Sequence, residues 1–231
     1  MKKTKFILTT TLFMFLVSCG SKESNSTQND STKNENTKSV DSLGANEVKI
    51  GSQIWMSENL NVEKFNNGDL IMEAKSPEEW ERAGKEGKPA WCYYDNNHNN
   101  NSKYGKLYNW YAVKDSRGLA PKGWHIPSNE EWNMLANNSD SIGVARSLKS
   151  DNGWLKDANG TNKSRFNAFP GGFRFYVGGF GYVGEYAAFW TSTPFNSLRS
   201  FHRYLNQSNQ LNRDDDGFDN GGGMSVRCVK D

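Results

Sequence analysis

Apolar residues are distributed unevenly along the chain, and their distribution divides it into three parts. Lysines at positions 2, 3 and 5 precede an apolar run at residues 6–17, which is the pattern of a secretory signal peptide. Residues 20–47 contain only three apolar side chains (Val40, Leu43 and Ala45), too few to offset the entropy lost on ordering the segment. We therefore predict a signal peptide at residues 1–18, a disordered tether at residues 19–47 and one folded domain at residues 48–231.

Short apolar and aromatic runs predict β structure through most of the folded domain. The string "VKIGSQIWM" from Val48 has two apolar stretches around Gly51, which indicates a hairpin. The string "PAWCYYD" at residues 89–95 is typical of a strand, and a polar turn follows it. Glycines alternate with aromatic residues at 169–193, which favours twisted strands and tight turns. The remainder of the chain, from residue 199, predicts strand, turn, strand, acidic loop and a closing strand "SVRCV".

One short helix is predicted from a capping box in "SPEEWERAG". Ser76 caps the helix, a proline occupies its first position, and Glu79 completes the box. Gly84 is the expected end of this helix. The aromatic string "YGKLYNWYAV" at residues 104–113 has a periodicity that does not distinguish a helix from a strand.

A second capping box occurs in "GWHIPSNEEW", where Ser128 is the cap and Glu131 completes the box. Three apolar residues then fall on one helical face (Trp132, Leu135 and Ala136). The residues before the cap form an extended segment in which His125 lies between Trp124 and Ile126. No partner motif stands near His125, so we interpret it as a packed, hydrogen-bonded residue of a strand rather than a catalytic base or a metal ligand.

The three cysteines divide into one lipidation candidate and one pair. Cys19 ends the string "LVSC", which resembles the lipobox of bacterial lipoproteins, so we expect Cys19 to be acylated and to anchor the protein to a membrane. The charged string at residues 21–23 loosely resembles a signal that exports lipoproteins to the cell exterior, which favours an outer-membrane, surface-exposed location. Cys92 and Cys228 remain in the exported domain. We expect a disulfide between them, and two separately buried thiols are the alternative.

Charge and motifs exclude several classes of function. Removing residues 1–18 takes away three of the 28 basic residues and none of the 26 acidic ones, which leaves 25 against 26 and implies no nucleic-acid partner. A literal G-x-G-x-x-G at Gly179, Gly181 and Gly184 lacks the strand–helix context of a nucleotide site. No serine elbow, zinc-ligand spacing or catalytic cysteine–histidine motif is present. We therefore expect no enzymatic activity.

The acidic string "NRDDDG" at residues 212–217 partly matches a calcium-binding loop. Oxygen-bearing side chains stand at alternate positions and a glycine is sixth, but the twelfth position, where such loops place a glutamate, is Gly223. A solvated acidic loop between the last two strands is the preferred interpretation. Calcium is a possible ligand, and no other metal or cofactor is expected.

Several strings, taken in order, resemble one family of bacterial surface proteins and lipoproteins, the Fibrobacter succinogenes major paralogous domain: "VKIGSQIWMSENLN", "WCYYD", "YGKLYNWYAV", "GLAPKGWHIPSNEEW", "FPGGFR", "FWTST" and "SVRCVKD". The resemblance implies an α+β, C-type-lectin-like fold of the formylglycine-generating-enzyme type, with short helices packed on small antiparallel sheets and long loops. It also implies that the two chain ends pair in a sheet. The chain departs from the family pattern at Ala120, where many members carry cysteine, and at residues 214–216, which leaves any shared ligand open.

This resemblance implies a fold and no agreed activity, so function is inferred from the C-terminal region. We expect a non-catalytic binding module for a glycan or a surface protein. Its candidate ligand-binding residues are polar or aromatic (Arg203, Tyr204, Asn206, Asn209, Asn212, Asp214 and Asp216), whereas Trp190 is expected in the core. The alternative is a structural or accessory lipoprotein of an envelope complex.

Overall fold

A computed structural model describes residues 43–137, 143–208 and 210–231, which belong to one compact unit. The predicted signal peptide, Cys19 and nearly all of the predicted tether lie outside these residues, as does Asn209. Within them, no helix combines the length and the apolar character needed to cross a bilayer.

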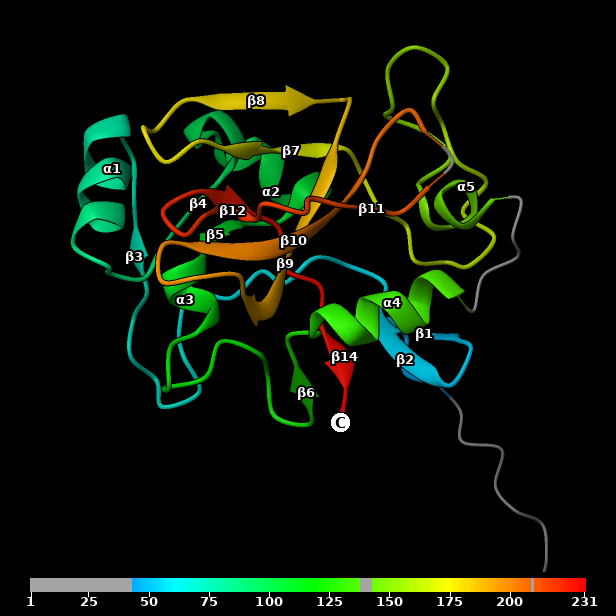
Figure 1. The fold of residues 1–231 in the computed structure, drawn as a ribbon, viewed down its shortest axis with the longest axis horizontal. Coiled ribbons are helices and arrows are strands. Elements are labelled where there is room, and N and C mark those ends of the chain that lie inside the picture. Colours follow the sequence, from blue (N-terminus) through cyan, green and yellow to red (C-terminus); the bar gives the residue numbers. More distant parts are fainter. Residues whose placement is uncertain (1–42, 138–142, 209) are drawn as a thin grey trace, which may run out of the picture. The chain divides into compact units, whose positions relative to one another are not determined.

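The two ends of the domain pair in a four-stranded antiparallel sheet with the order β1-β2-β14-β6. Its strands are β1 (Glu47–Ile50), β2 (Gln53–Met56), β6 (Trp124–His125) and β14 (Val229–Lys230). The predicted hairpin is confirmed, since β1 and β2 are joined at Gly51, whose φ of +60° suits glycine. Trp55 pairs with Val229, so the expected pairing of the chain ends is confirmed. Figure 1 shows β14 between β2 and β6, beside α4 (Asn129–Asn137).

A larger, mixed sheet fills the rest of the domain. The described residues form a ten-stranded sheet whose main path is β11-β10-β9-β7-β13-β5-β4-β3, with β12 paired to β10 and β8 paired to β7. Two of its pairs, β3–β4 and β7–β9, are parallel, so the expectation of small antiparallel sheets is corrected to one small antiparallel sheet and one large mixed sheet. The strands are β3 (Met72–Glu73), β4 (Ala90–Cys92), β5 (Leu107–Asn109), β7 (Gly171–Arg174), β8 (Phe180–Val183), β9 (Ala187–Pro194), β10 (Arg199–Leu205), β11 (Asn212–Arg213), β12 (Phe218–Asp219) and β13 (Gly223–Met224).

The helices in the described residues are few and short, which makes the fold α+β. Besides α4 they are α1 (Pro77–Lys85), α2 (Asn101–Tyr104), α3 (Trp110–Val113) and α5 (Val144–Leu148), with 3₁₀ turns at Tyr94–Asn96 and His98–Asn100. The string "YGKLYNWYAV" proves to hold both strand β5 and helix α3. Asn109 separates the two, because its Oδ1 accepts a hydrogen bond from the backbone N–H of Ala112. The literal G-x-G-x-x-G spans β8. Gly181 lies in the strand, and Gly179 and Gly184 lie directly before and after it.

Both predicted capping residues are confirmed. Ser128 Oγ accepts from the N–H of Glu131 at 3.2 Å, and the Glu131 carboxylate accepts from the N–H of Ser128 at 2.8 Å. Ser76 likewise caps α1, but the Glu79 carboxylate accepts from the N–H of Lys75 instead of Ser76.

The predicted end of α1 at Gly84 is wrong. The helix continues to Lys85 and closes through Gly87, whose φ is +63°. Lys88 N–H donates to Ala83 O and Gly87 N–H donates to Gly84 O, which is the Schellman arrangement. A glycine just past the last turn ends this helix, whereas Gly84 remains inside it.

The sheet itself keeps the two cysteines apart, so the disulfide interpretation is corrected. Cys92 and Cys228 are free, buried thiols. Neighbouring side chains of a strand point to opposite faces, and Trp91 packs in the hydrophobic cluster that contains Cys228, whereas Cys92 packs with Trp80 and Leu107 in a different cluster. The alternative of two separately buried thiols describes the fold.

Candidate functional site

Three of the predicted ligand residues lie around the turn between β10 and β11, near one end of the large sheet. Tyr204 on β10 lies opposite Asn212 on β11. Asn212 Nδ2 donates to Ser208 Oγ at 3.0 Å and to Asn206 Oδ1 at 3.4 Å. The structure therefore brings Tyr204, Asn206 and Asn212 together around the turn between β10 and β11.

Arg203 does not belong to this surface. Its side chain is on the other face of β10, and the residue is only 4% exposed. Its Nη2 donates to Asn129 O at 3.0 Å, to Asn129 Oδ1 at 2.7 Å and to Asn133 Oδ1 at 2.6 Å. Arg203 therefore holds α4 on the sheet, and its assignment as a ligand residue is corrected. Trp190 is fully buried and donates to Tyr108 O at 2.8 Å, as expected of a core residue.

Six aromatic rings from four strands and a loop form a closed circuit, which we call the aromatic cluster. Each ring contacts the next at a centroid distance of 5.0–5.7 Å, within the range of favourable aromatic pairs. In order around the circuit, the residues are Phe173 on β7, Tyr182 on β8, Tyr186 in the following loop, Tyr204 and His202 on β10, and Phe218 on β12. The circuit thus joins residues that are far apart in the sequence.

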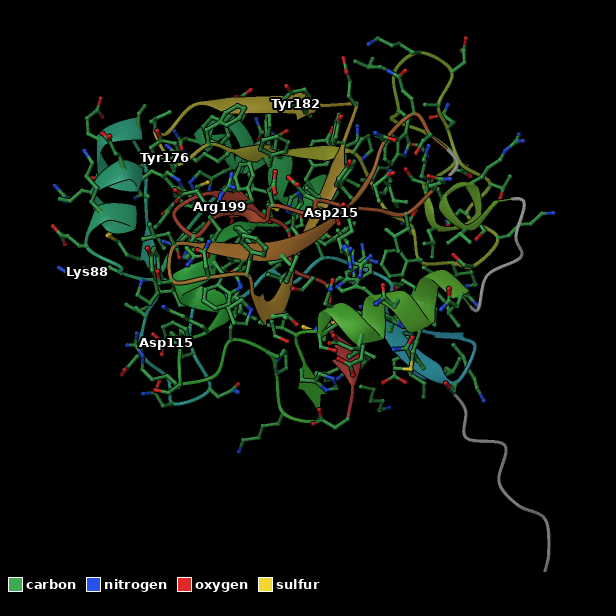
Figure 2. The ribbon with its side chains drawn as sticks, viewed as in Figure 1. Lys88, Asp115, Tyr176, Tyr182, Arg199 and Asp215 are labelled. Atoms are coloured by element: carbon green, nitrogen blue, oxygen red, sulfur yellow. The ribbon has the colours of Figure 1, made fainter. Side chains whose placement is uncertain are left out.

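The tyrosines give the aromatic cluster an accessible, polar surface. Tyr182 is 48% exposed, and Tyr186 and Tyr204 are partly buried. In the described part of the chain no hydrogen-bond partner is recorded for the hydroxyls of these three tyrosines, which leaves them able to bond to a ligand. Figure 2 labels Tyr182 on β8 and Asp215 on the loop between β11 and β12.

His202 supplies a buried polar atom without a partner at the base of the aromatic cluster. The residue is 6% exposed, and its Nδ1 has no hydrogen-bond partner among the described residues. Burial lowers the pKa of His202 to about 4, although the charge of Asp214 acts in the opposite direction. The ring is therefore neutral at physiological pH. Trp80 Nε1, Trp132 Nε1 and Arg203 Nε are likewise buried without a partner among the described residues, so the nitrogen of His202 alone does not identify a ligand site.

The acidic loop borders the aromatic cluster. Asp214 is partly buried, whereas Asp215 and Asp216 are exposed. Burial, followed by the charges around it, including those of Asp214 and Asp215, raises the pKa of Tyr204, so its hydroxyl stays protonated. The loop lies between β11 and β12, which both pair with β10, and not between the last two strands as predicted.

Internal contacts already stabilise the acidic loop. Arg213 pairs with Asp215 at 2.7 Å, and Arg199 Nη1 donates to Asp216 O at 3.0 Å. The N–H of Asp216 donates to Asp214 Oδ1 at 3.1 Å. The described residues include no group of three or more histidine, cysteine, aspartate or glutamate side chains placed to hold a metal ion. Calcium binding by the acidic loop stays a prediction.

Sequence reasoning missed most of the aromatic cluster, although a signal for part of it was present. Phe173, Tyr182, Tyr186 and Phe218 come from strands and a loop that only the fold brings together. His202 and Tyr204, by contrast, are two residues apart on one strand and therefore share a face. That spacing alone marks the histidine as a neighbour of the predicted Tyr204.

A polar pocket of about 200 Å³ lies apart from the aromatic cluster, between the segment after β2 and helix α2. None of its lining residues belongs to the aromatic cluster or the acidic loop.

Comparison with known proteins gives one match. The Fibrobacter succinogenes major domain matches residues 48–230, which is nearly the whole of the described chain. No curated protein and no solved structure matches the sequence significantly.

Proposed function

This chain belongs to the Fibrobacter succinogenes major domain family, and we propose that it is a non-catalytic binding module whose ligand is a glycan held on the aromatic cluster. The flat faces of Tyr182, Tyr186 and Tyr204 suit the apolar face of a sugar ring. The tyrosine hydroxyls and the neighbouring amides and carboxylates suit its hydroxyl groups.

The closed aromatic circuit with its exposed Tyr182 ring carries this proposal. A purely structural cluster has no need of an accessible ring such as that of Tyr182, which is 48% exposed. Concave or partly buried aromatic surfaces with a few convergent polar groups are typical of ligand sites.

The proposal extends to how the domain is displayed. Acylation at Cys19 would anchor the chain in the bacterial outer membrane, and the segment at residues 19–47 would hold the domain away from the bilayer at the cell surface. We also propose a C-type-lectin-like fold of the formylglycine-generating-enzyme type. The paired chain ends in β2 and β14 support this assignment.

A glycan array probed with the soluble domain tests the function. We expect binding to at least one class of glycan, and we expect Tyr204→Ala to lose most of it. An array that stays blank for the wild-type domain contradicts the glycan proposal.

A second candidate function is a structural or accessory role in an envelope complex. Several large apolar side chains are exposed after β7 and between β9 and β10, namely Tyr176, Val177, Phe195 and Leu198. Tyr176 and Leu198 line one shallow pocket of about 220 Å³. Exposed apolar patches mark protein contacts. Crosslinking in intact cells separates the candidates, because an assembly role requires a protein partner in a fixed ratio.

A further inference from the structure

The polar pocket between the segment after β2 and helix α2 has a charge arrangement that the aromatic cluster lacks. Its volume is about 200 Å³, and its lining includes Glu58, Asn59, Asn101, Lys103, Asn167 and Arg227. We call it the Arg227 pocket. These residues come from distant parts of the chain, so only the folded domain assembles it.

Arg227 brings a buried positive charge to this pocket. The residue is 1% exposed. Its guanidinium donates to Asn59 Oδ1 from both Nε and Nη2, at 3.1 Å and 2.6 Å, and from Nη1 to Met56 O and Phe166 O. All of these acceptors are neutral. Among the described residues no carboxylate lies within ion-pair distance of Arg227, and Glu58 of the same lining is the carboxylate whose charge acts on it.

Asn59 occupies the place where an aspartate would neutralise Arg227. Its amide is fixed, because Nδ2 donates to Tyr104 O at 2.9 Å and to Ser225 Oγ at 3.2 Å, which turns Oδ1 toward the guanidinium. A buried charge costs free energy unless an opposite charge is near. Burial lowers the pKa of Arg227 to about 9, which still leaves it charged at neutral pH. The guanidinium is hydrogen-bonded to neutral acceptors, and an anion in the pocket would add an opposite charge close to it.

Lys103 adds a second positive charge at the rim of the pocket. Its Nζ lies 5.0 Å from the Tyr104 ring centroid and 5.9 Å from that of Phe169. No ion pair of Lys103 is recorded among the described residues. Glu58 is the opposing charge in the lining, and it is exposed to solvent, where water screens it. Two cations against one screened carboxylate favour a negative occupant.

We propose that the Arg227 pocket binds a small anionic group, a carboxylate, phosphate or sulfate, through Arg227 and Lys103. Asn101 and Asn167 also line the pocket; their Oδ1 atoms accept hydrogen bonds from Asn61 and Asn162, which leaves their Nδ2 groups as further donors for an anion. Its volume is below the roughly 300–1,000 Å³ of pockets that take drug-sized ligands, which suits a single anionic group. The group is either a free anion or a substituent of a larger molecule, such as the carboxylate of a uronic acid. The site does not depend on the function of the aromatic cluster.

Titration calorimetry at constant ionic strength tests the proposal, with phosphate, glucuronate and uncharged glucose as probes. We expect saturable binding of phosphate or glucuronate and none of glucose. Binding of phosphate identifies a free oxyanion, and binding of glucuronate alone identifies an anionic sugar. No saturable binding of either anion overturns the proposal.

Charge variants make the test specific to the pocket. Lys103→Gln is expected to weaken anion binding about fivefold, and Glu58→Gln to strengthen it by a similar factor, since each removes one charge near the anion. Lys122→Gln, at an exposed lysine that does not line the pocket, is the matched control and should bind like the wild type. Equal effects of Lys103→Gln and Lys122→Gln, or no gain from Glu58→Gln, overturn the proposal.

Discussion

His125 shows how one side chain can join three separate parts of the chain. Its Nδ1 lies 2.7 Å from Asp231 Oδ1, and its Nε2 lies 2.7 Å from Glu131 Oε1. The residue therefore links β6 to the start of α4 and to the last residue of the described chain. The prediction that His125 is a hydrogen-bonded strand residue is confirmed, but its side chain is 41% exposed and not packed in the core as expected. Its partners were missed, because Glu131 was assigned only to the cap and Asp231 reaches His125 only through the fold.

The first prediction concerns the pH dependence of this link. Burial acts to lower the pKa of His125, but its hydrogen bonds and charge contacts with Glu131 and Asp231 raise it overall. The stabilisation is therefore complete below the unfolded pKa of about 6.5, and it is lost as the pH rises through the folded value. We expect His125→Gln to cost about 0.5–1 kcal/mol more at pH 6 than at pH 9, measured by chemical denaturation. A cost that does not change with pH contradicts the link.

Buried Cys92 and Cys228 are predicted to be unreactive in the native domain. Burial raises the pKa of Cys92 to about 11 and that of Cys228 to about 12, so little of either thiol is ionised at pH 8. Mass spectrometry after alkylation of the domain at residues 43–231, which lacks Cys19, should show no adduct on the native protein and two adducts on protein denatured without reductant. A denatured, unreduced protein that takes up no alkyl group would instead contain the disulfide.

At the scale of elements, the two faces of strand β10 carry residues with different roles. Its Arg203 faces α4, whereas His202 and Tyr204 face the aromatic cluster. The alternation follows from strand geometry, in which successive side chains point to opposite faces. A polar residue on such a strand is therefore assigned to a ligand or to the core only when the register of the sheet is known.

Replacement of Arg203 tests its structural task. Arg203→Ala removes three hydrogen bonds to α4 and leaves Asn129 and Asn133 without their partner. We expect a loss of about 2–4 kcal/mol in the free energy of unfolding, measured with urea. Arg199→Ala on the same strand, where the exposed side chain bonds only to Asp216 O, should cost less than about 0.5 kcal/mol. Equally small losses of unfolding free energy in the Arg203→Ala and Arg199→Ala variants would contradict the structural role of Arg203 and favour its assignment as a ligand residue.

Local chemistry predicted the elements better than it predicted the sites. The hairpin at Gly51 and the caps at Ser76 and Ser128 depend on residues within a few positions of one another, and all are present. The opposed faces of Trp91 and Cys92 depend on the sheet, and the aromatic cluster depends on contacts between strands. Features formed by residues close in the sequence could therefore be predicted. Contacts between distant segments could not, because the sequence of one segment does not show which side chains of another segment pack against it.

At the scale of the whole molecule, the proposed protein consists of a lipid anchor at Cys19, a tether and a binding domain. The folded domain begins within the last residues of the predicted tether, since β1 starts at Glu47, and Cys19 precedes it in the sequence. We predict that Cys19→Ala abolishes palmitate labelling in cells and moves the protein from the membrane fraction to the soluble fraction. Continued labelling of the variant contradicts acylation at this cysteine.

Ligand binding at the aromatic cluster is the central claim, and two tyrosines of similar exposure test it most directly. Tyr182, in the cluster, is 48% exposed, and Tyr176, with no recorded ring contact, is 51% exposed. The measurement is the affinity for the best glycan from the array, titrated into Tyr182→Ala and Tyr176→Ala. We predict at least a tenfold loss for Tyr182→Ala, equivalent to about 1.4 kcal/mol, and wild-type affinity for Tyr176→Ala. Wild-type affinity in the Tyr182→Ala variant would contradict the aromatic cluster as the ligand site.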